Sequence, residues 1–406
     1  MKLISGGVTA AKGFKASGIH AGVKASSSPD KNDLAMILCD SEATAAGVYT
    51  MNRVKAAPIY VTMEHLENGT CRGIIANSGN ANACAPMGHE NAVKMCEAAA
   101  AATGLQPQDF IVASTGVIGQ SLNVSVIEKA CPTLASLLSK DGSMEAATAI
   151  MTTDTKAKEI AVSFEIGGKE IRMGGIAKGS GMIHPNMGTM LCFLTTDCAI
   201  SSDVLHNALY EVTKVTFNRV SVDGDTSTND TCCILASGQA GNELIDWKSE
   251  DYDIFYDALK YVCTELAKKI AGDGEGATKL VTCTVSGSRS EEVAERLSME
   301  VIRSSLVKAA MFGADANWGR VICAMGYSKA PFRPEYVDVA FASKAGSIVV
   351  CQKGEGLTFD EDKAKEVLSQ PEVEILVNVN EGEHSATAWG CDLTYDYVKI
   401  NGDYRT

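Results

Sequence analysis

The stretch 159–195 constrains the fold most strongly, because its hydrophobic pattern predicts neighbouring strands in the middle of the chain. Residues 159–165 and 169–173 alternate between apolar and polar side chains, and a Gly-Gly pair stands between them. This pattern predicts a β-hairpin. Residues 190–195 are more uniformly apolar, which is typical of a strand buried in the core. The sequence therefore predicts a sheet around the centre of the chain.

Helical and strand patterns occur in clusters along the rest of the chain. The segments with a helical pattern are 90–102, which Gly104 should end, 124–140, which Pro132 should interrupt, 143–151, 202–217, 250–271 and 291–311. The segments with a strand pattern are 280–285, 321–327, 337–341, 347–351, 373–379 and 387–400. Because strands and helices cluster instead of alternating one with one, the sequence predicts an α+β fold built in layers.

The length and the charge of the chain limit the classes of protein that it can be. Its 406 residues allow two or three domains at roughly 150 residues each, or two closely packed halves. A formal net charge of −14 argues against binding to nucleic acid or to an anionic membrane, although a local basic pocket stays open. We expect no membrane span, and the first residues lack the apolar core of a secretory signal.

The 14 cysteines favour a reducing compartment. No two of them have C-x-x-C spacing, so neither a zinc site nor a redox site is indicated. Most stand among apolar neighbours, as Cys192 does, which is typical of small core residues in a cytoplasmic protein. The six histidines show no ligand spacing, and the residues after Asp223 lack the pattern of a calcium loop. We therefore expect a cytoplasmic protein without a metal site.

A glycine and a threonine stand at the entrance to the buried strand and permit self-cleavage. A simple turn is the plainer interpretation, because glycine favours turns and threonine favours strands. A threonine hydroxyl can also attack the preceding carbonyl group, and Gly188 would leave that carbonyl unshielded. Cleavage would give Thr189 a free α-amine with an ordinary pKa of about 7.7–8.0, so this residue would carry both nucleophile and base.

The residues around Thr189 form one of several long motifs. The stretch I-A-K-G-S-G-M-I-H-P-N-M-G-T-M-L closely resembles the signature of the ornithine acetyltransferase family. The stretches that match this family in the same order are A-N-S-G-N-A-N-A-C, S-T-G-V-I-G, M-T-T-D-T, S-V-D-G-D-T-S-T-N-D-T, G-D-G-E-G-A-T-K, D-A-N-W-G-R and I-N-G-D-Y-R-T. The resemblance covers essentially the whole chain.

This resemblance implies an activity and a fold. The family transfers an acetyl group from N-acetylornithine to glutamate, and the resemblance implies that Thr189 carries the acetyl group between the two half-reactions. It implies cleavage between Gly188 and Thr189 into an α chain, 1–188, and a β chain, 189–406. The two chains would share a layered α-β-β-α fold of the N-terminal-nucleophile type and assemble into an oligomer of αβ units. No cofactor is implied, and use of acetyl-CoA as a second donor stays open.

The resemblance also assigns roles to residues far apart in the sequence. The Thr115 hydroxyl and the Gly116 backbone N–H would form an oxyanion hole, which their pattern alone would give as a tight turn. Lys178 would bind a substrate carboxylate, and Glu275 would face the ammonium group of the ornithine side chain. The remaining substrate-binding residues implied are Thr152, with Thr153 as an alternative, Thr189, Asn401 and Thr406.

Two other functions compete with acetyl transfer. A self-cleaving amidohydrolase or aminopeptidase would use the same nucleophile, and water would replace glutamate as the acceptor. A non-catalytic ligand-binding protein would have a plain turn at Gly188 and Thr189. His184 stands close to Thr189, but a free α-amine leaves no need for it as a base. Asn77, Asn80 and Asn82 are expected to order the backbone near the site.

Overall fold

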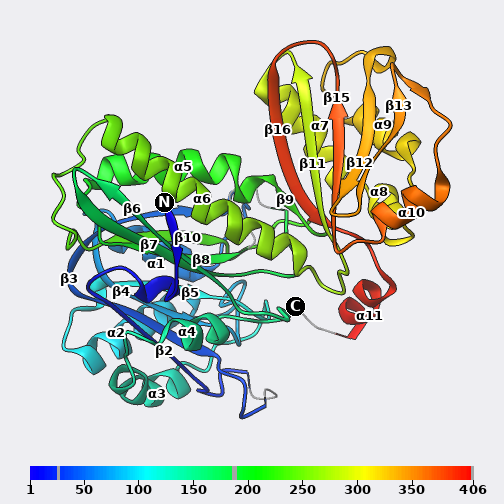
Figure 1. Cartoon of the computed structure of the whole chain (residues 1–406). Coiled ribbons are helices and arrows are strands. Elements are labelled where there is room, and N and C mark those ends of the chain that lie inside the picture. The colour runs from blue at the N-terminus through cyan, green and yellow to red at the C-terminus, as the bar shows by residue number, and fades with distance from the viewer. Residues whose placement is uncertain (25–27, 185–189, 404–406) are drawn as a thin grey trace.

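The computed structural model describes residues 1–24, 28–184 and 190–403, and these residues form two lobes (Figure 1). The larger lobe contains a nine-stranded sheet and the smaller lobe a seven-stranded sheet, and both sheets are mixed. The expected α+β class is therefore confirmed. Gly188, Thr189 and Thr406 lie outside the described residues.

The larger sheet has the strand order β1-β6-β7-β8-β10-β3-β4-β5, and β2 pairs with β3 beside this path. Its strands are β1 (Lys2–Ile4), β2 (Phe14–Ile19), β3 (Leu34–Tyr49), β4 (Thr70–Asn77), β5 (Phe110–Ser114), β6 (Lys158–Ile166), β7 (Lys169–Lys178), β8 (Leu191–Thr196) and β10 (Thr231–Ala236). The pairs β8–β10 and β4–β5 are parallel, and the other pairs are antiparallel. The hairpin expected from the alternating pattern is β6 and β7.

Strand β8 is buried on both faces, as its uniformly apolar sequence predicts. Leu191 and Phe193 pack in a core shared with Ile111 of β5, whereas Cys192 and Leu194 pack in a second core shared with helices α5 (Ser202–Val215) and α6 (Glu250–Gly272). One core therefore combines residues of the sheet with helix α4 (Ser143–Ala149), and the other combines the sheet with α5 and α6. This double burial holds the start of β8 firmly in place.

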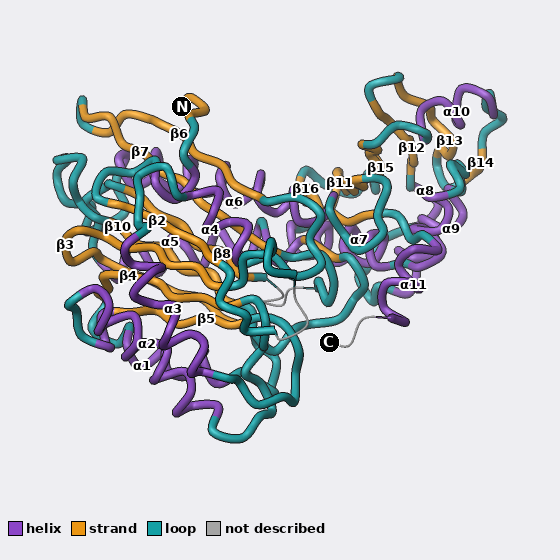
Figure 2. The backbone as a smooth tube through the Cα atoms, turned by 90° about the horizontal axis from the view of Figure 1, so that it is seen from below, coloured by secondary structure: helices purple, strands orange, loops and turns teal. Residues whose placement is uncertain are grey.

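The long strand β3 connects the two parts of this sheet. Its first half pairs with β2 and β4, and its second half pairs with β10. The register with β4 shifts between Leu38 and Ala43. Helices α1 (Ala57–His65), α2 (Gly88–Thr103) and α3 (Val124–Ser136) pack on the outer side of β3, β4 and β5 (Figure 2), and α4 (Ser143–Ala149) packs against β2 and β3.

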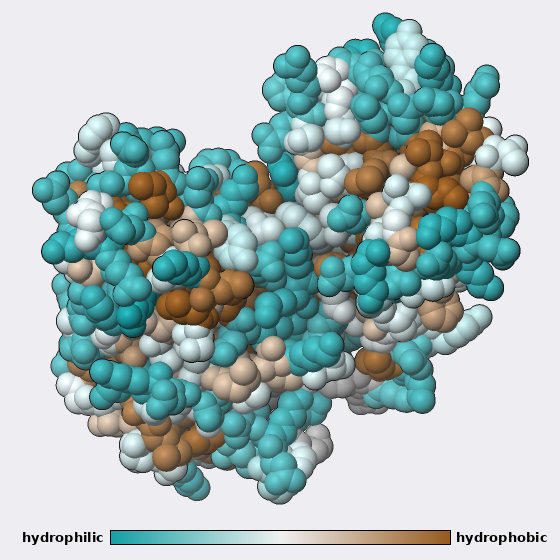
Figure 3. All heavy atoms as spheres, viewed as in Figure 1, coloured by the Kyte–Doolittle hydropathy of each residue, from teal (hydrophilic) through white to brown (hydrophobic). Residues whose placement is uncertain are grey.

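The smaller lobe has the strand order β14-β13-β12-β15-β11-β16-β9. Its strands are β9 (Val220–Ser221), β11 (Leu280–Ser288), β12 (Asp338–Ser343), β13 (Gly346–Gln352), β14 (Glu355–Gly356), β15 (Glu372–Asn378) and β16 (His384–Cys391). Helices α7 (Glu291–Arg303), α8 (Ser305–Phe312), α9 (Trp318–Tyr327) and α10 (Glu361–Leu368) share its core. A hollow separates the two lobes on the face shown in Figure 3.

Most predicted elements are present, and four predictions are wrong. The segment 291–311 is two helices, because the backbone of Ser304 is extended and its hydroxyl caps α8 by accepting from the N–H of Val307. Helix α3 continues past Pro132 to Ser136. Two predicted strands contain helical residues. The whole of 321–327 lies in α9, and the predicted strand 387–400 ends as β16 at Cys391, after which helix α11 (Tyr395–Asp403) begins.

The cysteines behave as core residues. All fourteen are free, and all are buried except Cys84 and Cys323. Their expected connection with a cytoplasmic location stays a prediction. Among the described residues, no helix is both long enough and apolar enough to cross a membrane.

Candidate active site

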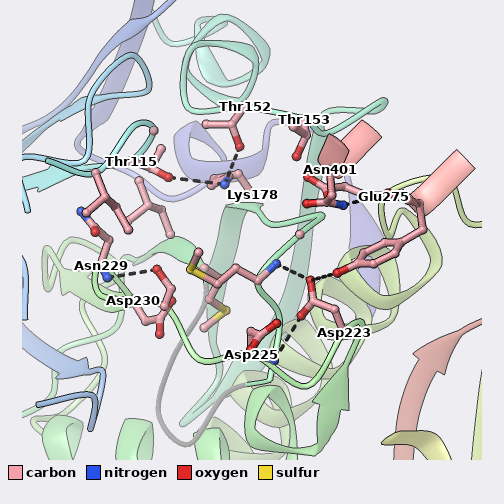
Figure 4. A pocket seen from close by; sticks show the side chains of 18 residues that line it. Thr115, Thr152, Thr153, Lys178, Asp223, Asp225, Asn229, Asp230, Glu275 and Asn401 are labelled. Carbon is pink, nitrogen blue, oxygen red and sulfur yellow. Dashed lines mark hydrogen bonds between the residues drawn. The ribbon is translucent and has the colours of Figure 1, made fainter. Parts of the chain in front are cut away.

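A cavity of about 210 Å³ lies where the ends of β5 and β7 meet the starts of β8 and β10 (Figure 4). The loop after α6 and the final helix α11 complete its wall. The structure brings together all the described residues that the sequence indicated for the site: Thr115, Gly116, Thr152, Lys178, Glu275 and Asn401. Met190, the residue after Thr189, also lines the cavity.

The loop after β5 is held in place by buried asparagines, as expected. The Asn77 side-chain oxygen accepts hydrogen bonds from the N–H groups of Gly79 (3.2 Å) and Asn80 (3.1 Å), and its backbone oxygen accepts from Thr115 (2.9 Å). Gly116 has a φ of 130°, and a Cβ atom there would lie 2.8 Å from the Asn80 nitrogen. Only glycine fits this contact without displacing the backbone. The loop therefore presents Thr115 and the Gly116 N–H in a fixed position.

Lys178 is the last residue of β7 and faces two hydroxyl groups. Its ammonium donates to Thr152 Oγ1 across 2.8 Å and, over a longer 3.5 Å, to Thr115 Oγ1. An ammonium group only donates, so both hydroxyls accept, and each keeps its own proton for another acceptor. Thr153 also lines the cavity, but Thr152 is the threonine that bonds to Lys178. Burial lowers the pKa of Lys178, and the carboxylate of Asp154, 4.0 Å away, opposes that change.

Acidic side chains form another part of the wall. Glu275 is 5% exposed and accepts a hydrogen bond of 2.7 Å from the Asn401 amide. Asp223 accepts from the backbone N–H of Met182 at 2.6 Å and from the Tyr397 hydroxyl at 3.4 Å. Burial raises the pKa of Asp223. The cavity thus contains a buried cation together with buried carboxyl groups.

Asn229 and Asp230 are site residues that the sequence reasoning missed. The Asn229 amide donates to the backbone oxygens of Ala81 (2.6 Å) and Ser114 (2.7 Å) and so connects the start of β10 to the loop after β5. Asp230 is 2% exposed, and neither carboxyl oxygen has a hydrogen bond of ordinary geometry to a described residue, although the Thr50 side chain and the Met190 backbone lie close enough to favour its charged form. Burial raises the pKa of Asp230 well above its usual range. Both residues belong to the D-T-S-T-N-D-T motif, which matched the family in the sequence, but the motif alone did not indicate what either residue does.

His184 does not line this cavity. It lines a separate one together with Arg303, and burial lowers its pKa to about 4, so it is neutral at pH 7. Across the described ranges there is no cluster of three or more histidine, cysteine, aspartate or glutamate side chains suited to a metal ion.

Comparison with known proteins gives matches over nearly the whole chain. Residues 15–406 match the ArgJ family. Arginine biosynthesis bifunctional protein ArgJ 1 of Clostridium acetobutylicum is 49% identical over 394 residues, covering 97% of this chain and 96% of that protein. Glutamate N-acetyltransferase of Methanocaldococcus jannaschii is 45% identical over 414 aligned residues, covering 100% of both chains.

A solved structure matches about half of this chain. The crystal structure of arginine biosynthesis bifunctional protein argJ from Bacillus halodurans is 46% identical, with a TM-score of 0.50. The match covers 98% of the solved chain but 52% of this one. Taken with the full-length sequence matches, these likenesses establish that the chain belongs to the ArgJ family.

Proposed function

We propose that this protein is a self-cleaving acetyltransferase of arginine biosynthesis that moves an acetyl group from N-acetylornithine to glutamate. The observation that carries the proposal is a single cavity holding the Lys178 ammonium, the Glu275 carboxylate and the Thr115–Gly116 loop. An amino acid with a carboxylate at one end and an ammonium at the other matches the first two groups. The names of the full-length relatives, ArgJ and glutamate N-acetyltransferase, support the same activity.

The proposed reaction has two half-reactions on Thr189. The Thr189 hydroxyl attacks the acetyl carbonyl carbon, and its α-amine takes the hydroxyl proton. The carbonyl oxygen becomes an oxyanion that accepts hydrogen bonds from the Thr115 hydroxyl and the Gly116 N–H. The C–N bond then breaks, the proton passes to the leaving nitrogen, and ornithine departs. In the second half the neutral glutamate amine attacks the acetyl ester, the C–O bond to Thr189 breaks, and the α-amine passes the proton lost by the glutamate nitrogen to the Thr189 oxygen, which restores the hydroxyl.

The oxyanion hole has a structural basis in this chain. Because Lys178 donates to Thr115 Oγ1, the Thr115 proton is left for an acceptor in the cavity. The Gly116 N–H belongs to a loop that Asn77 and Asn80 hold before any ligand arrives, through the Thr115 N–H and the Gln120 backbone oxygen. Donors that are already aimed at the reacting oxygen do not need to reorganise during the reaction.

Cleavage between Gly188 and Thr189 is part of the proposal. It would give an α chain, 1–188, and a β chain, 189–406. Lys178 of β7 pairs with Leu191 of β8, and β3 pairs with β10, so strands from both sides of the cut belong to one sheet. The two chains would therefore stay together as an αβ unit with shared layers, as in N-terminal-nucleophile enzymes, and oligomerise further. A solved relative that covers 52% of this chain but is itself matched over 98% fits such a division.

An acetyl-transfer assay tests the function. Purified protein is incubated with glutamate and either N-acetylornithine or acetyl-CoA, and a parallel reaction with N-acetylornithine and water alone measures hydrolysis. We expect N-acetylglutamate from N-acetylornithine, and an added acetyl group on the fragment that begins at Thr189. The acetyl-CoA reaction decides whether that donor is used. Release of acetate at the same rate with and without glutamate would instead establish the amidohydrolase alternative.

A further inference from the structure

Lys178 has a buried group of charges behind it that the proposed reaction does not use. The Lys158 ammonium lies 2.6 Å from a carboxylate oxygen of Asp154 and 2.6 Å from one of Asp273. The side chains of Asp154 and Lys158 are 0% and 2% exposed. Asp273 also accepts hydrogen bonds from the hydroxyl and the N–H of Thr155. Two ammonium groups and two carboxylates are therefore packed together beneath the cavity.

Asp154 is the residue of this buried group that lies next to both Lys178 and Thr152, which line the cavity. One carboxylate oxygen accepts from Lys158 and, at 2.7 Å, from the N–H of Gly179. The other oxygen accepts from the N–H of Thr152 at 3.1 Å and lies 4.0 Å from the Lys178 ammonium. Burial opposes the charge of Asp154, but the two lysines and these hydrogen bonds outweigh it and hold its pKa at about 2. Asp154 is thus an anion at neutral pH.

We propose that Asp154 is a positioning residue for substrate: it holds Lys178 and Thr152 as a pair that binds a carboxylate, and it keeps the Lys178 ammonium charged inside the protein. The proposal rests on the proposed function for the identity of the substrate. Asp154 does not line the cavity, so it acts through Lys178 and Thr152. Through Lys178 it also influences Thr115, because the hydroxyl proton of Thr115 is directed to the cavity only while Lys178 donates to that hydroxyl.

The charges around Lys178 show why Asp154 is needed. Burial lowers the pKa of Lys178, and the neighbouring Lys158 ammonium lowers it further. Asp154, Asp230 and Glu275 act in the opposite direction, with Asp154 the largest of the three. Asp230 is itself an acid whose pKa burial raises, and Glu275 would be engaged by the ligand ammonium. Asp154 is therefore the anion on which the charge of Lys178 depends when substrate binds.

The kinetic experiment measures KM for N-acetylornithine between pH 7 and pH 10 in the wild type and in Asp154→Asn. Removing the anion lowers the pKa of Lys178, so the variant loses the ammonium at a lower pH. We expect its KM to rise at a lower pH than that of the wild type, with a difference of about tenfold or more at the upper end, because a carboxylate this close moves an ammonium pKa by about 1 to 3. Profiles that superimpose would overturn the proposal.

Two further variants separate positioning from a general effect on folding. A guanidinium stays protonated throughout this pH range, so Asp154→Asn combined with Lys178→Arg should remove the pH dependence of KM relative to Asp154→Asn alone. Asp197→Asn is the matched control. Asp197 is likewise a buried carboxyl group that accepts from backbone N–H groups, but it follows the far end of β8. Its pH profile should match the wild type, and an equal change in this control would contradict a specific role for Asp154.

A titration that needs no activity keeps the two proposals distinguishable. NMR of the lysine side chains measures the pKa of Lys178 directly in the uncomplexed protein, with Lys178→Arg used to assign the signal. We expect a lower value in Asp154→Asn. If that variant does not fold, Lys158→Gln removes a repelling cation and should raise the value instead. No change in either variant overturns the role of Asp154, whereas a wild type that transfers no acetyl group contradicts only the proposed function.

Discussion

The side-chain amide of Asn401 donates a hydrogen bond of 2.7 Å to the carboxylate of Glu275, and this bond connects the last helix of the chain to the loop after α6. Helix α11 has no buried residue among those described, so apolar packing does little to hold it. Its other contacts include the hydrogen bond from the Tyr397 hydroxyl to Asp223 and, just before the helix, the bond from the Thr394 hydroxyl to the backbone oxygen of Gly276. The Tyr395 ring also packs edge-to-face on the Phe312 ring. The cavity wall that α11 supplies therefore depends on a few polar bonds and on one ring contact made by an exposed tyrosine.

Replacing Gly276 with alanine should displace α11. Gly276 has a φ of 69°, and an added Cβ atom would lie 2.7 Å from the Tyr397 nitrogen and 2.9 Å from the Asp396 carbonyl carbon. We expect KM for N-acetylornithine to rise several-fold and the melting temperature to fall by only a few degrees, because alanine at this φ is strained but the helix buries little apolar surface. Gly402→Ala is the control, since no described atom lies within 4 Å of its Cβ position. Equal KM values in the two variants would show that α11 does not need this close contact.

Glu275→Gln should weaken binding of ornithine-type ligands without preventing cleavage. The glutamine keeps the size of the side chain and an oxygen for Asn401, but it removes the charge that would meet the ligand ammonium. Hydrogen bonds to charged groups contribute about 1.5–3 kcal/mol, so KM for N-acetylornithine should rise roughly 10- to 100-fold. Steady-state kinetics measure this change, and gel electrophoresis follows processing. Loss of processing to the same degree would point to misfolding.

Thr189→Ala should give one uncut and inactive chain. The substitution removes the hydroxyl that would attack the Gly188 carbonyl and later the acetyl group, so both reactions should stop. Intact-protein mass spectrometry should find a single species of full length, against two fragments from the wild type. Circular dichroism checks that the variant is folded. Fragments beginning at residue 189 in this variant would remove Thr189 from the cleavage chemistry.

Asp230→Asn should stabilise the protein at neutral pH. The raised pKa of Asp230 means that the folded state keeps a proton that the unfolded state has lost, so the wild-type free energy of unfolding falls as pH rises from about 4 toward that folded-state pKa. Asparagine has no charge to bury and escapes this loss. We expect a higher melting temperature for the variant at pH 7–8, with the difference disappearing near pH 4. A wild type that is the more stable protein at pH 8 would show that Asp230 is charged and paired.

The sequence predicts an element well where the decisive interactions lie between near neighbours in the chain. The predicted end of a helix at Gly104 matches the end of α2, because Gly104 adopts the left-handed conformation that closes a helix, with a φ of 74°. In the long helix α6, apolar residues at four-residue spacing predict one buried face, and its members Ala258, Val262, Leu266 and Ile270 are buried. Ile254, the first member of that face, is instead exposed.

The same reasoning failed where packing decided between two local structures. The apolar run at 321–327 fits either a strand or a helix by composition. In the structure, Asn317 caps it by accepting from the N–H of Arg320, and Val321, Ala324 and Met325 face the core at helical spacing. Tertiary contacts therefore selected the helix.

Sequence by itself determined the strands around the centre of the chain, the covering helices and the motifs that contain Thr115, Lys178 and Glu275, because these features depend on residue type and short-range order. Only the tertiary structure decided that Asp154 lies beneath Lys178, that Asp230 lines the cavity and that Asn401 reaches Glu275. The physical reason is that burial and charge pairing act through space. A carboxylate becomes a counter-ion or a neutral acid according to what the fold brings beside it, and neighbours in the sequence do not determine which.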